Sequence, residues 1–246
     1  MAIDFAALRF NSVLGRAARL PLRLIPGGAT MRVLQGPLKG AKWIAGSHTH
    51  GCWLGSYELD KQRLFAEHVR QGDAVWDIGA NVGFYTLLAS RLVGPTGRVI
   101  AFEPSPRNLH YLREHVARNR LPNVTVFDAA VGERPGRVAF DESPGPAMGK
   151  VGAGSITVPL VSVDDLVATG KAPPPTLLKI DVEGAEAMVL RGALDALRTS
   201  PRPKVFLATH GPSVHKECTD ILRSAGYALL PLSGPDVENA DELLAA

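Results

Sequence analysis

The sequence predicts an α/β fold with a mostly parallel sheet that is covered by helices on both faces. Segments typical of buried strands alternate with segments typical of helices, and this alternation requires crossover connections between parallel strands. A turn with two glycines, Gly79 and Gly83, follows a buried strand and opens a helix, as in Rossmann-like folds. At 246 residues, the chain is long enough for one such domain with an extension.

Apolar patterns place the individual elements in order along the chain. Strands are predicted at 74–78, 98–102, 124–127, 176–180, 205–209 and 227–232, and helices at 57–72, 84–92, 108–119, 185–197 and 214–224. Residues 132–175 are rich in Gly and Pro and interrupt the alternation. We interpret them as a hairpin insertion into the sheet domain.

These elements predict three regions. Residues 1–50 form an N-terminal extension with a short amphipathic helix before Pro21 and a small hairpin near 31–45. The helix is expected to pack on the catalytic domain or on a second copy in a homodimer, with contact to a membrane surface as the alternative. Residues 51–232 form the catalytic domain, and residues 233–246 form a C-terminal tail.

Composition excludes several classes of protein. Hydrophobic residues make up 46% and charged residues 21%, which is typical of a folded globular protein. Seven Lys or Arg residues lie within residues 1–42, so the remainder is mildly acidic and nucleic acid is not expected as a partner. No apolar run is long enough to span a membrane and no signal peptide is evident, so a cytoplasmic location is expected. Cys52 and Cys218 are expected to be reduced.

The strongest functional signal is the segment in which a strand ends at Asp77 and turns through Gly79 and Gly83 into a helix. Backbone amides at such a turn lie at the carboxyl edge of a parallel sheet, where doubly wound folds bind ligands. Glu103 ends the next strand, at the position that binds a ribose hydroxyl in nucleotide-binding α/β folds. Together these elements predict a cofactor that contains a nucleoside.

The charge of the turn favours S-adenosylmethionine over a nicotinamide dinucleotide. A dinucleotide would place its pyrophosphate at the helix N-terminus, where Asp77 would repel it. S-adenosylmethionine carries a sulfonium and an α-ammonium group, for which an acidic residue is favourable. Asp128 ends the third strand, where it would meet the adenine amino group or, alternatively, be a solvated turn residue.

Four ordered segments resemble motifs of the FkbM family of methyltransferases. They are 53–58 (WLGSYE), 77–86 (DIGANVGFYT), 101–106 (AFEPSP) and 178–186 (LKIDVEGAE). The resemblance covers about residues 50–230 and implies a class I methyltransferase fold, S-adenosylmethionine as donor and an oxygen acceptor on a sugar or natural product. Ala208 departs from the family pattern, in which many members have a Glu two residues before the equivalent of His210.

The resemblance and the strand ends together give the expected site residues. The expected cofactor contacts are Tyr57, Asp77, Gly79, Ala80, Asn81, Gly83, Glu103, Asp128 and Asp181. The resemblance also implies that Asp181, Glu183 and Glu186 form an acidic set near the active site, where Glu183 is expected to contact the substrate.

His210 and Asp181 are the expected catalytic residues. Both follow predicted strands, so they share the sheet edge with Asp77 and Glu103. Histidine suits removal of the acceptor proton because its ordinary pKa lies near neutrality, and His210 is expected to contact the substrate as well. Asp181 would orient the acceptor hydroxyl or contact the methionine end of the cofactor. A structural role for His210 is the alternative, and Lys179 is a weaker candidate for the base.

No metal ion is expected. The alternative is Mg²⁺ bound by Asp181, Glu183 and Glu186, since Mg²⁺ prefers carboxylates and water. We interpret His48 and His50, close to Cys52, as loop histidines and not as metal ligands.

The function predicted from the sequence is O-methylation of a hydroxylated small molecule. The enzymatic alternatives are methylation of nitrogen or of a macromolecule. A module that binds S-adenosylmethionine without catalysis is the alternative from another class, and a dinucleotide oxidoreductase ranks below it. The sequence does not name the acceptor, because specificity in such folds lies in loops and insertions.

Overall fold

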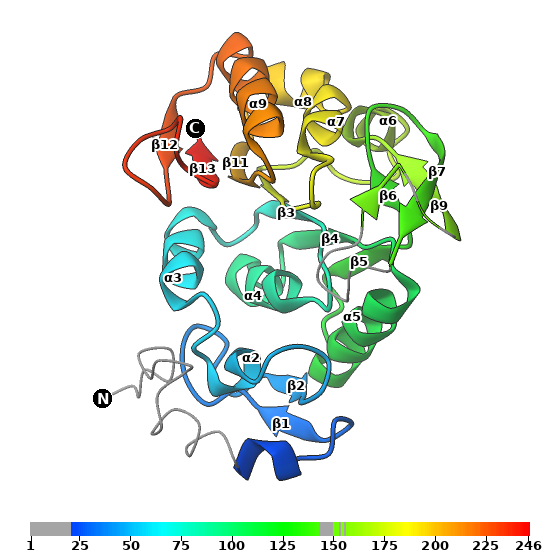
Figure 1. Ribbon diagram of the computed structural model, residues 1–246, viewed down its shortest axis with the longest axis vertical. Helices are drawn as coiled ribbons and strands as arrows, with labels where there is room; N and C mark the ends of the chain where they lie inside the picture. The colour runs from blue at the N-terminus through cyan, green and yellow to red at the C-terminus, as the bar shows by residue number, and fades with distance from the viewer. Residues whose placement is uncertain (1–20, 143–149, 153, 155) are drawn as a thin grey trace.

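A seven-stranded sheet forms the centre of the protein in the computed structural model, which describes residues 21–142, 150–152, 154 and 156–246 (Figure 1). Its order is β12-β13-β11-β10-β3-β4-β5. The bounds are β3 Ala74–Ile78, β4 Arg98–Phe102, β5 Val124–Phe127, β10 Leu177–Ile180, β11 Lys204–Ala208, β12 Leu229–Pro231 and β13 Glu242–Ala245. Every pair from β11 to β5 is parallel, which confirms the predicted sheet.

Helices cover both faces of this sheet. One face packs against α3 (Leu59–His68), α4 (Phe84–Val93) and α5 (Pro106–Asn119). The opposite face packs against α6 (Val163–Ala168), α7 (Glu186–Arg191), α8 (Leu194–Arg198) and α9 (Pro212–Ser224). Because side chains alternate along a strand, Val75 faces the first group and Trp76 the second, and all five residues of β3 are buried.

The insertion after β5 contains the predicted hairpin, two further short strands and a helix. The hairpin is β7 (Gly136–Asp141) paired antiparallel with β9 (Ile156–Val161). It belongs to a four-stranded sheet that also contains β6 (Ala130–Val131) and β8 (Lys150–Val151). The helix α6, which the sequence analysis did not predict, follows β9 and begins at the Ser162 cap.

The C-terminal region differs from the predicted tail. Residues 242–245 form β13, which lies antiparallel between β12 and β11 (Figure 1). Leu243, Leu244 and Ala245 are buried, so burial of apolar side chains accounts for this strand. The predicted helix 185–197 is also interrupted, between α7 and α8. Gly192 ends α7 where a Cβ would lie 2.0 Å from the carbonyl oxygen of Gly132.

The N-terminal extension contains the expected hairpin, β1 (Thr30–Arg32) paired with β2 (Lys42–Ile44). A short 3₁₀ helix, η1 (Pro21–Leu24), precedes it, and α2 (Gly51–Leu54) follows. The rest of the helix predicted before Pro21 lies outside the described residues, as does its expected role in a homodimer.

His115 of α5 joins this hairpin to the turn after β3. Its Nε2 accepts the backbone N–H of Ile44 at 2.9 Å, and its Nδ1 donates to the carbonyl oxygen of Val82 at 2.7 Å. The ring stacks on Trp43, with centroids 4.0 Å apart. Burial lowers the pKa of His115 to about 4, so the ring is neutral and fits this pattern of one acceptor and one donor.

Two further expectations concern the whole chain. Cys52 and Cys218 are free and buried, as the sequence predicted. Among the described residues, no helix has the length and apolar character to cross a membrane.

Candidate active site

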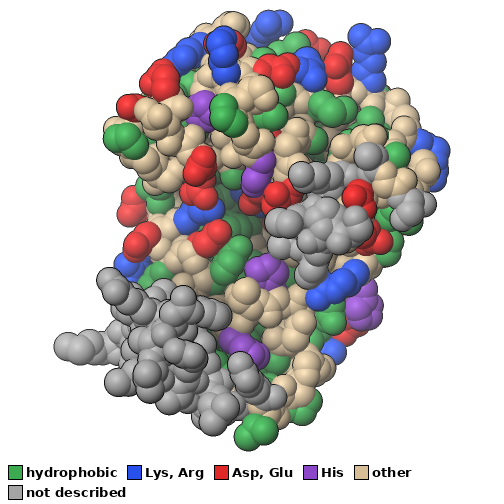
Figure 2. Space-filling view, viewed as in Figure 1, with side chains coloured by type: hydrophobic (Ala, Val, Ile, Leu, Met, Phe, Trp, Pro, Cys, Tyr) green, Lys and Arg blue, Asp and Glu red, His purple; other side chains and the backbone are tan. Residues whose placement is uncertain are grey.

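A cavity of about 320 Å³ lies at the carboxyl edge of the parallel strands. Figure 2 shows a hollow in the middle of this face, bordered by acidic, basic and histidine side chains. Its wall includes the residues that follow β3, β4, β10 and β11, namely Gly79, Glu103, Asp181 and His210. The edge predicted from the strand order is therefore the edge that carries the cavity.

The turn after β3 is held against two neighbouring strands. The amides of Gly79 and Ala80 donate to the carbonyl oxygen of Phe102, at 3.1 and 2.9 Å. Gly79 has a φ of 79°, and a Cβ there would lie 1.9 Å from the carbonyl oxygen of Asp181. Gly83, with a φ of 95°, begins α4 against the side chain of Leu112. Glycine is required at 79 by the close approach of Asp181.

Glu103 presents a fixed carboxylate to the cavity. Its side chain is 5% exposed, and its two oxygens accept the backbone N–H groups of Asn81 and Ser105, each at 2.8 Å. Burial raises the pKa of Glu103 to about 7, and the two backbone donors oppose that rise. The side chain of Asn108 and the charge of Lys179 also oppose it.

Three residues expected in the cofactor site, Asp77, Gly83 and Asp128, do not line the cavity. Asp77 is 1% exposed, and its carboxylate accepts the Thr86 hydroxyl at 2.6 Å and lies 3.4 Å from Nζ of Lys179. Asp128 is half exposed and pairs with Arg113 of α5. This position agrees with a solvated turn residue, and a contact of Asp128 with the adenine amino group stays a prediction.

Tyr57 and Glu58 close the cavity opposite the strand ends. Tyr57 packs its ring against Phe84, with centroids 5.1 Å apart. Glu58 accepts the Tyr85 hydroxyl at 2.9 Å and lies 3.2 Å from Nζ of Lys61. Lys61 also pairs with Glu242 of β13, so the C-terminal strand contributes to the cavity wall.

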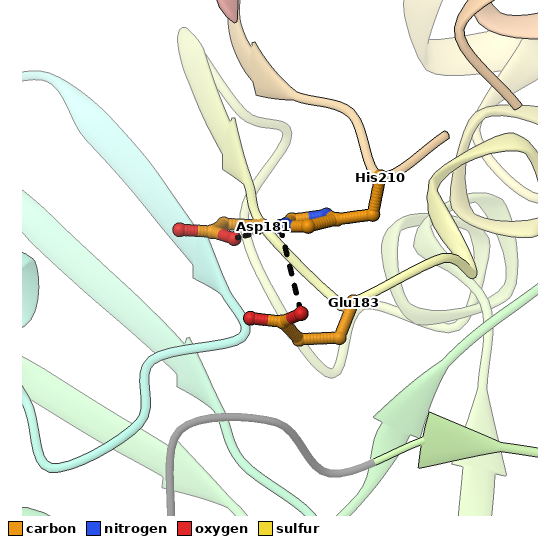
Figure 3. A group of neighbouring side chains, drawn as sticks. All are labelled: Asp181, Glu183 and His210. Atoms are coloured by element: carbon orange, nitrogen blue, oxygen red, sulfur yellow. Dashed lines mark ion pairs between the residues drawn. The ribbon is translucent and has the colours of Figure 1, made fainter. Parts of the chain in front are cut away.

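Asp181, Glu183 and His210 converge at the cavity (Figure 3). Nε2 of His210 lies 3.8 Å from Oδ1 of Asp181 and 3.6 Å from Oε2 of Glu183. Lys179 reaches the same carboxylate from below the strand end, with its Nζ 3.5 Å from Oδ2 of Asp181. Burial opposes the charge of Asp181, but Lys179, His210 and Lys61 outweigh it and lower the pKa of Asp181.

Glu186 orients His210 from the other side. Its Oε1 lies 2.8 Å from Nδ1 of His210 and accepts the backbone N–H of Gly184 at 2.9 Å. The hydrogen bond to Glu186 is the largest cause that raises the pKa of His210; burial opposes it, and the charges of Glu183, Glu186 and Asp181 add to it. Glu186 is thus buried behind the imidazole and bonds Nδ1, so that Nε2 of His210 is the ring nitrogen that faces the cavity.

Residues 77–229 match the methyltransferase FkbM domain. The chain belongs to the FkbM family of methyltransferases. It is 33% identical over 172 residues to the hexuronic acid methyltransferase AglP of Haloferax volcanii, covering 68% of this chain and 69% of that protein. It is 28% identical over 215 residues to the 31-O-demethyl-FK506 methyltransferase FkbM of Streptomyces tacrolimicus, covering 72% and 82%.

Solved structures agree on the fold. The methyltransferase FkbM of Methylobacillus flagellatus has a TM-score of 0.53 at 22% identity, over 75% of this chain and 50% of that chain. A putative O-methyltransferase from Klebsiella pneumoniae has a TM-score of 0.52 at 14% identity, over 77% and 80%. The Rossmann-like methyltransferase fold predicted from the sequence is confirmed. The assignment as an enzyme is confirmed by the family match and the two relatives.

Within this FkbM-family site, the described residues contain one group with the geometry to hold a metal ion. One ligand atom from each of Asp181, Glu183 and His210 lies within 4.8 Å of the others. The set differs from the alternative in the sequence analysis, because Glu186 bonds His210 and backbone amides instead of facing the cavity.

The sequence analysis missed three charged residues of this FkbM-family site: Glu58, Lys61 and Glu242. Glu58 ends the first family-like segment, so its position was a signal that we used only for Tyr57. Glu242 had no signal, because the chain after residue 232 was interpreted as a tail.

Proposed function

We propose that this FkbM-family enzyme transfers the methyl group of S-adenosylmethionine to a hydroxyl oxygen of a sugar or another hydroxylated small molecule. The observation that carries the proposal is the His210–Glu186 pair, which presents Nε2 of the imidazole at the wall of the cavity. A neutral imidazole in that orientation can accept a proton from a hydroxyl group. The relatives support an oxygen acceptor, since one is named for a hexuronic acid and the other for a 31-O-demethyl compound.

The residues around the cavity fit S-adenosylmethionine. A volume of about 320 Å³ falls at the lower end of the roughly 300–1,000 Å³ found for small-molecule sites. Glu103, buried and fixed by two backbone donors, would accept hydrogen bonds from the ribose hydroxyls. Gly79, Ala80, Asn81 and Gly83 would pass beneath the cofactor, and Tyr57 would cover it. When bound, S-adenosylmethionine supplies an electrophilic methyl group on a sulfonium.

The chain's own residues would position and deprotonate the acceptor. Asp181 and Glu183 would hold acceptor hydroxyl groups beside Nε2 of His210, and most of the rate gain would come from this orientation. His210 would take the hydroxyl proton at Nε2, while Glu186 keeps the proton at Nδ1 and stabilises the imidazolium that forms. In this proposal Asp181 and His210 are the catalytic residues, and Glu183 and His210 contact the substrate.

The experiment is transfer of a labelled methyl group from S-adenosylmethionine to a panel of hydroxylated sugars and natural products. Each acceptor is paired with an analogue that has an amine in place of the hydroxyl. Labelled product from the hydroxyl compound is expected. Label in the amine analogue alone would assign N-methylation. Binding of the cofactor without transfer to any acceptor would favour a binding module.

A further inference from the structure

The α-ammonium group of S-adenosylmethionine needs an anionic partner, and the residue expected to supply it is not at the cavity wall. Asp77 is buried beneath the turn, where the Thr86 hydroxyl and Lys179 occupy its carboxylate. Its side chain is not part of the cavity wall. If the cofactor lies along the turn at 79–83, a carboxylate for the ammonium has to come from the cavity wall, where Glu58 and Asp181 both lie.

Lys179 also changes the charge of the wall above Asp77. Its Nζ lines the cavity and donates to the carbonyl oxygen of Gly79 at 3.1 Å. The carbonyl oxygen of Gly79 therefore already accepts a hydrogen bond, and its donor is the positively charged Lys179. Asp77 and Asp181 both pair with this charge, at 3.4 and 3.5 Å, so Lys179 already has carboxylate partners in the protein.

Glu58 is a carboxylate of the cavity wall that the sequence analysis did not assign to the cofactor. Its Oε2 accepts the hydroxyl of Tyr85, which lies in the first turn of α4, directly after the glycine turn. Tyr85 also lies near Lys179, whose Nζ is 5.5 Å from its ring centroid. Glu58 is therefore tied to the helix that follows the cofactor turn. Lys61 beside it has Glu242 as a second partner, so it does not need Glu58 to remain paired.

The backbone at Glu58 gives an independent indication. Four non-glycine residues in the described part of the chain have a positive φ, and three of them line the cavity: Glu58 at 45°, Asn81 at 51° and Glu183 at 54°. A left-handed backbone is unfavourable for a glutamate, and such strained residues gather at ligand sites. Asn81 belongs to the cofactor turn, and Glu183 lies with Asp181 and His210, for which we propose contacts with the acceptor. Glu58 is the strained cavity residue that has no proposed ligand contact.

We propose that the Glu58 carboxylate binds the α-ammonium group of S-adenosylmethionine, with Tyr85 holding it in place. This assignment rests on the proposed cofactor.

The test compares two probes by calorimetry. S-adenosylhomocysteine has the amino-acid group, whereas 5′-methylthioadenosine keeps the adenosine and the thioether but lacks it. Glu58→Gln should weaken binding of S-adenosylhomocysteine by about 10- to 100-fold, the range of a lost charged hydrogen bond, and leave binding of 5′-methylthioadenosine unchanged. Glu67→Gln, on the exposed side of α3, is the matched control and should change neither.

A second variant separates the carboxylate from the backbone. Glu58→Gly removes the side chain and relieves the left-handed strain, but it also removes the acceptor of the Tyr85 hydroxyl, so its folding is checked by urea denaturation. The folded variant should still lose affinity for S-adenosylhomocysteine. Unchanged affinity for S-adenosylhomocysteine in both variants, or an equal loss for both probes, would overturn the assignment. If the parent binds neither probe, the proposed cofactor fails instead.

Discussion

Nδ1 of His210 lies 2.8 Å from Oε1 of Glu186, whose side chain has no exposed surface. Residues 24 positions apart thus form one unit, in which a buried carboxylate fixes the ring and its tautomer. The other ring nitrogen faces Asp181 and Glu183 across less than 4 Å. This arrangement determines how the rate should depend on pH.

Activity should rise with pH through the pKa of His210, which lies above its ordinary value of 6.5. The base must be neutral, so kcat/KM for the acceptor is low below that pKa and reaches a plateau above it. Glu186→Gln keeps an oxygen for the backbone donors and for Nδ1 of His210 but removes the negative charge, which weakens the effect of Glu186 on His210. The rise of kcat/KM should therefore move to lower pH. The profile is measured with saturating cofactor, because Glu103 titrates near pH 7. If the pH at which kcat/KM rises is the same in Glu186→Gln as in the parent, the titration belongs to another group.

His210→Ala should lower kcat by roughly 10²–10⁴-fold, while the affinity for S-adenosylhomocysteine stays nearly constant. Asp181→Asn should also lower kcat, because it weakens the orientation of the acceptor. His110→Ala, at an exposed position of α5, is the control and should retain the parent rate. A His210→Ala enzyme that turns over like the parent would make this histidine structural.

Glu103→Gln should weaken binding of both S-adenosylhomocysteine and 5′-methylthioadenosine by about 1–3 kcal/mol, because both probes contain the ribose. The glutamine oxygen still accepts one backbone N–H group, which limits damage to the turn. The joint loss distinguishes Glu103 from Glu58, for which only one probe is affected. Affinity equal to the parent's for both probes would contradict the ribose assignment.

Chelation should leave turnover unchanged. The proposed mechanism uses Asp181, Glu183 and His210 for orientation and proton transfer, and it requires no cation. Initial rates are compared before and after dialysis against EDTA, and again after Mg²⁺ is added. Activity that disappears with EDTA and returns with Mg²⁺ would make these three residues metal ligands.

Leu243→Ala should reduce the free energy of unfolding by about 2–5 kcal/mol, because Leu243 of β13 has no exposed surface. Leu230→Ala in the neighbouring strand β12 removes the same atoms from a side chain that is 54% exposed, and it should change stability by roughly 0.5 kcal/mol or less. Urea denaturation measures both. Equal effects would show that β13 contributes little to the sheet.

The parallel strands were predictable because each is a short apolar run bounded by a turn, and because Gly79 and Gly83 mark the cofactor turn locally. The antiparallel strand β13 was not, since it is only four residues long and its pairing with β11 depends on distant residues. The break between α7 and α8 likewise depends on the approach of Gly192 to Gly132, which no local pattern records.

The candidate site was predictable where a residue's position in the sheet decides its place. Strand ends brought Glu103, Asp181 and His210 to one cavity, as expected. Side-chain pairing was not predictable in this way. Asp77 is buried beside Lys179 and does not line the cavity, and Asp128 pairs with Arg113 at the surface. The roles given to individual residues stay predictions until the variants are measured.

The imidazole of His115 makes the N-terminal hairpin and the cofactor turn thermodynamically linked. A movement of β2 that breaks the bond to Ile44 removes one of the two hydrogen bonds that fix the ring, and the other is the bond to Val82 in the turn. Linkage of this kind is reciprocal, so a molecule that binds the hairpin and one that binds the turn alter each other's affinity by the same factor. Because the pKa of His115 is lowered to about 4, the link persists unchanged from mildly acidic to alkaline conditions.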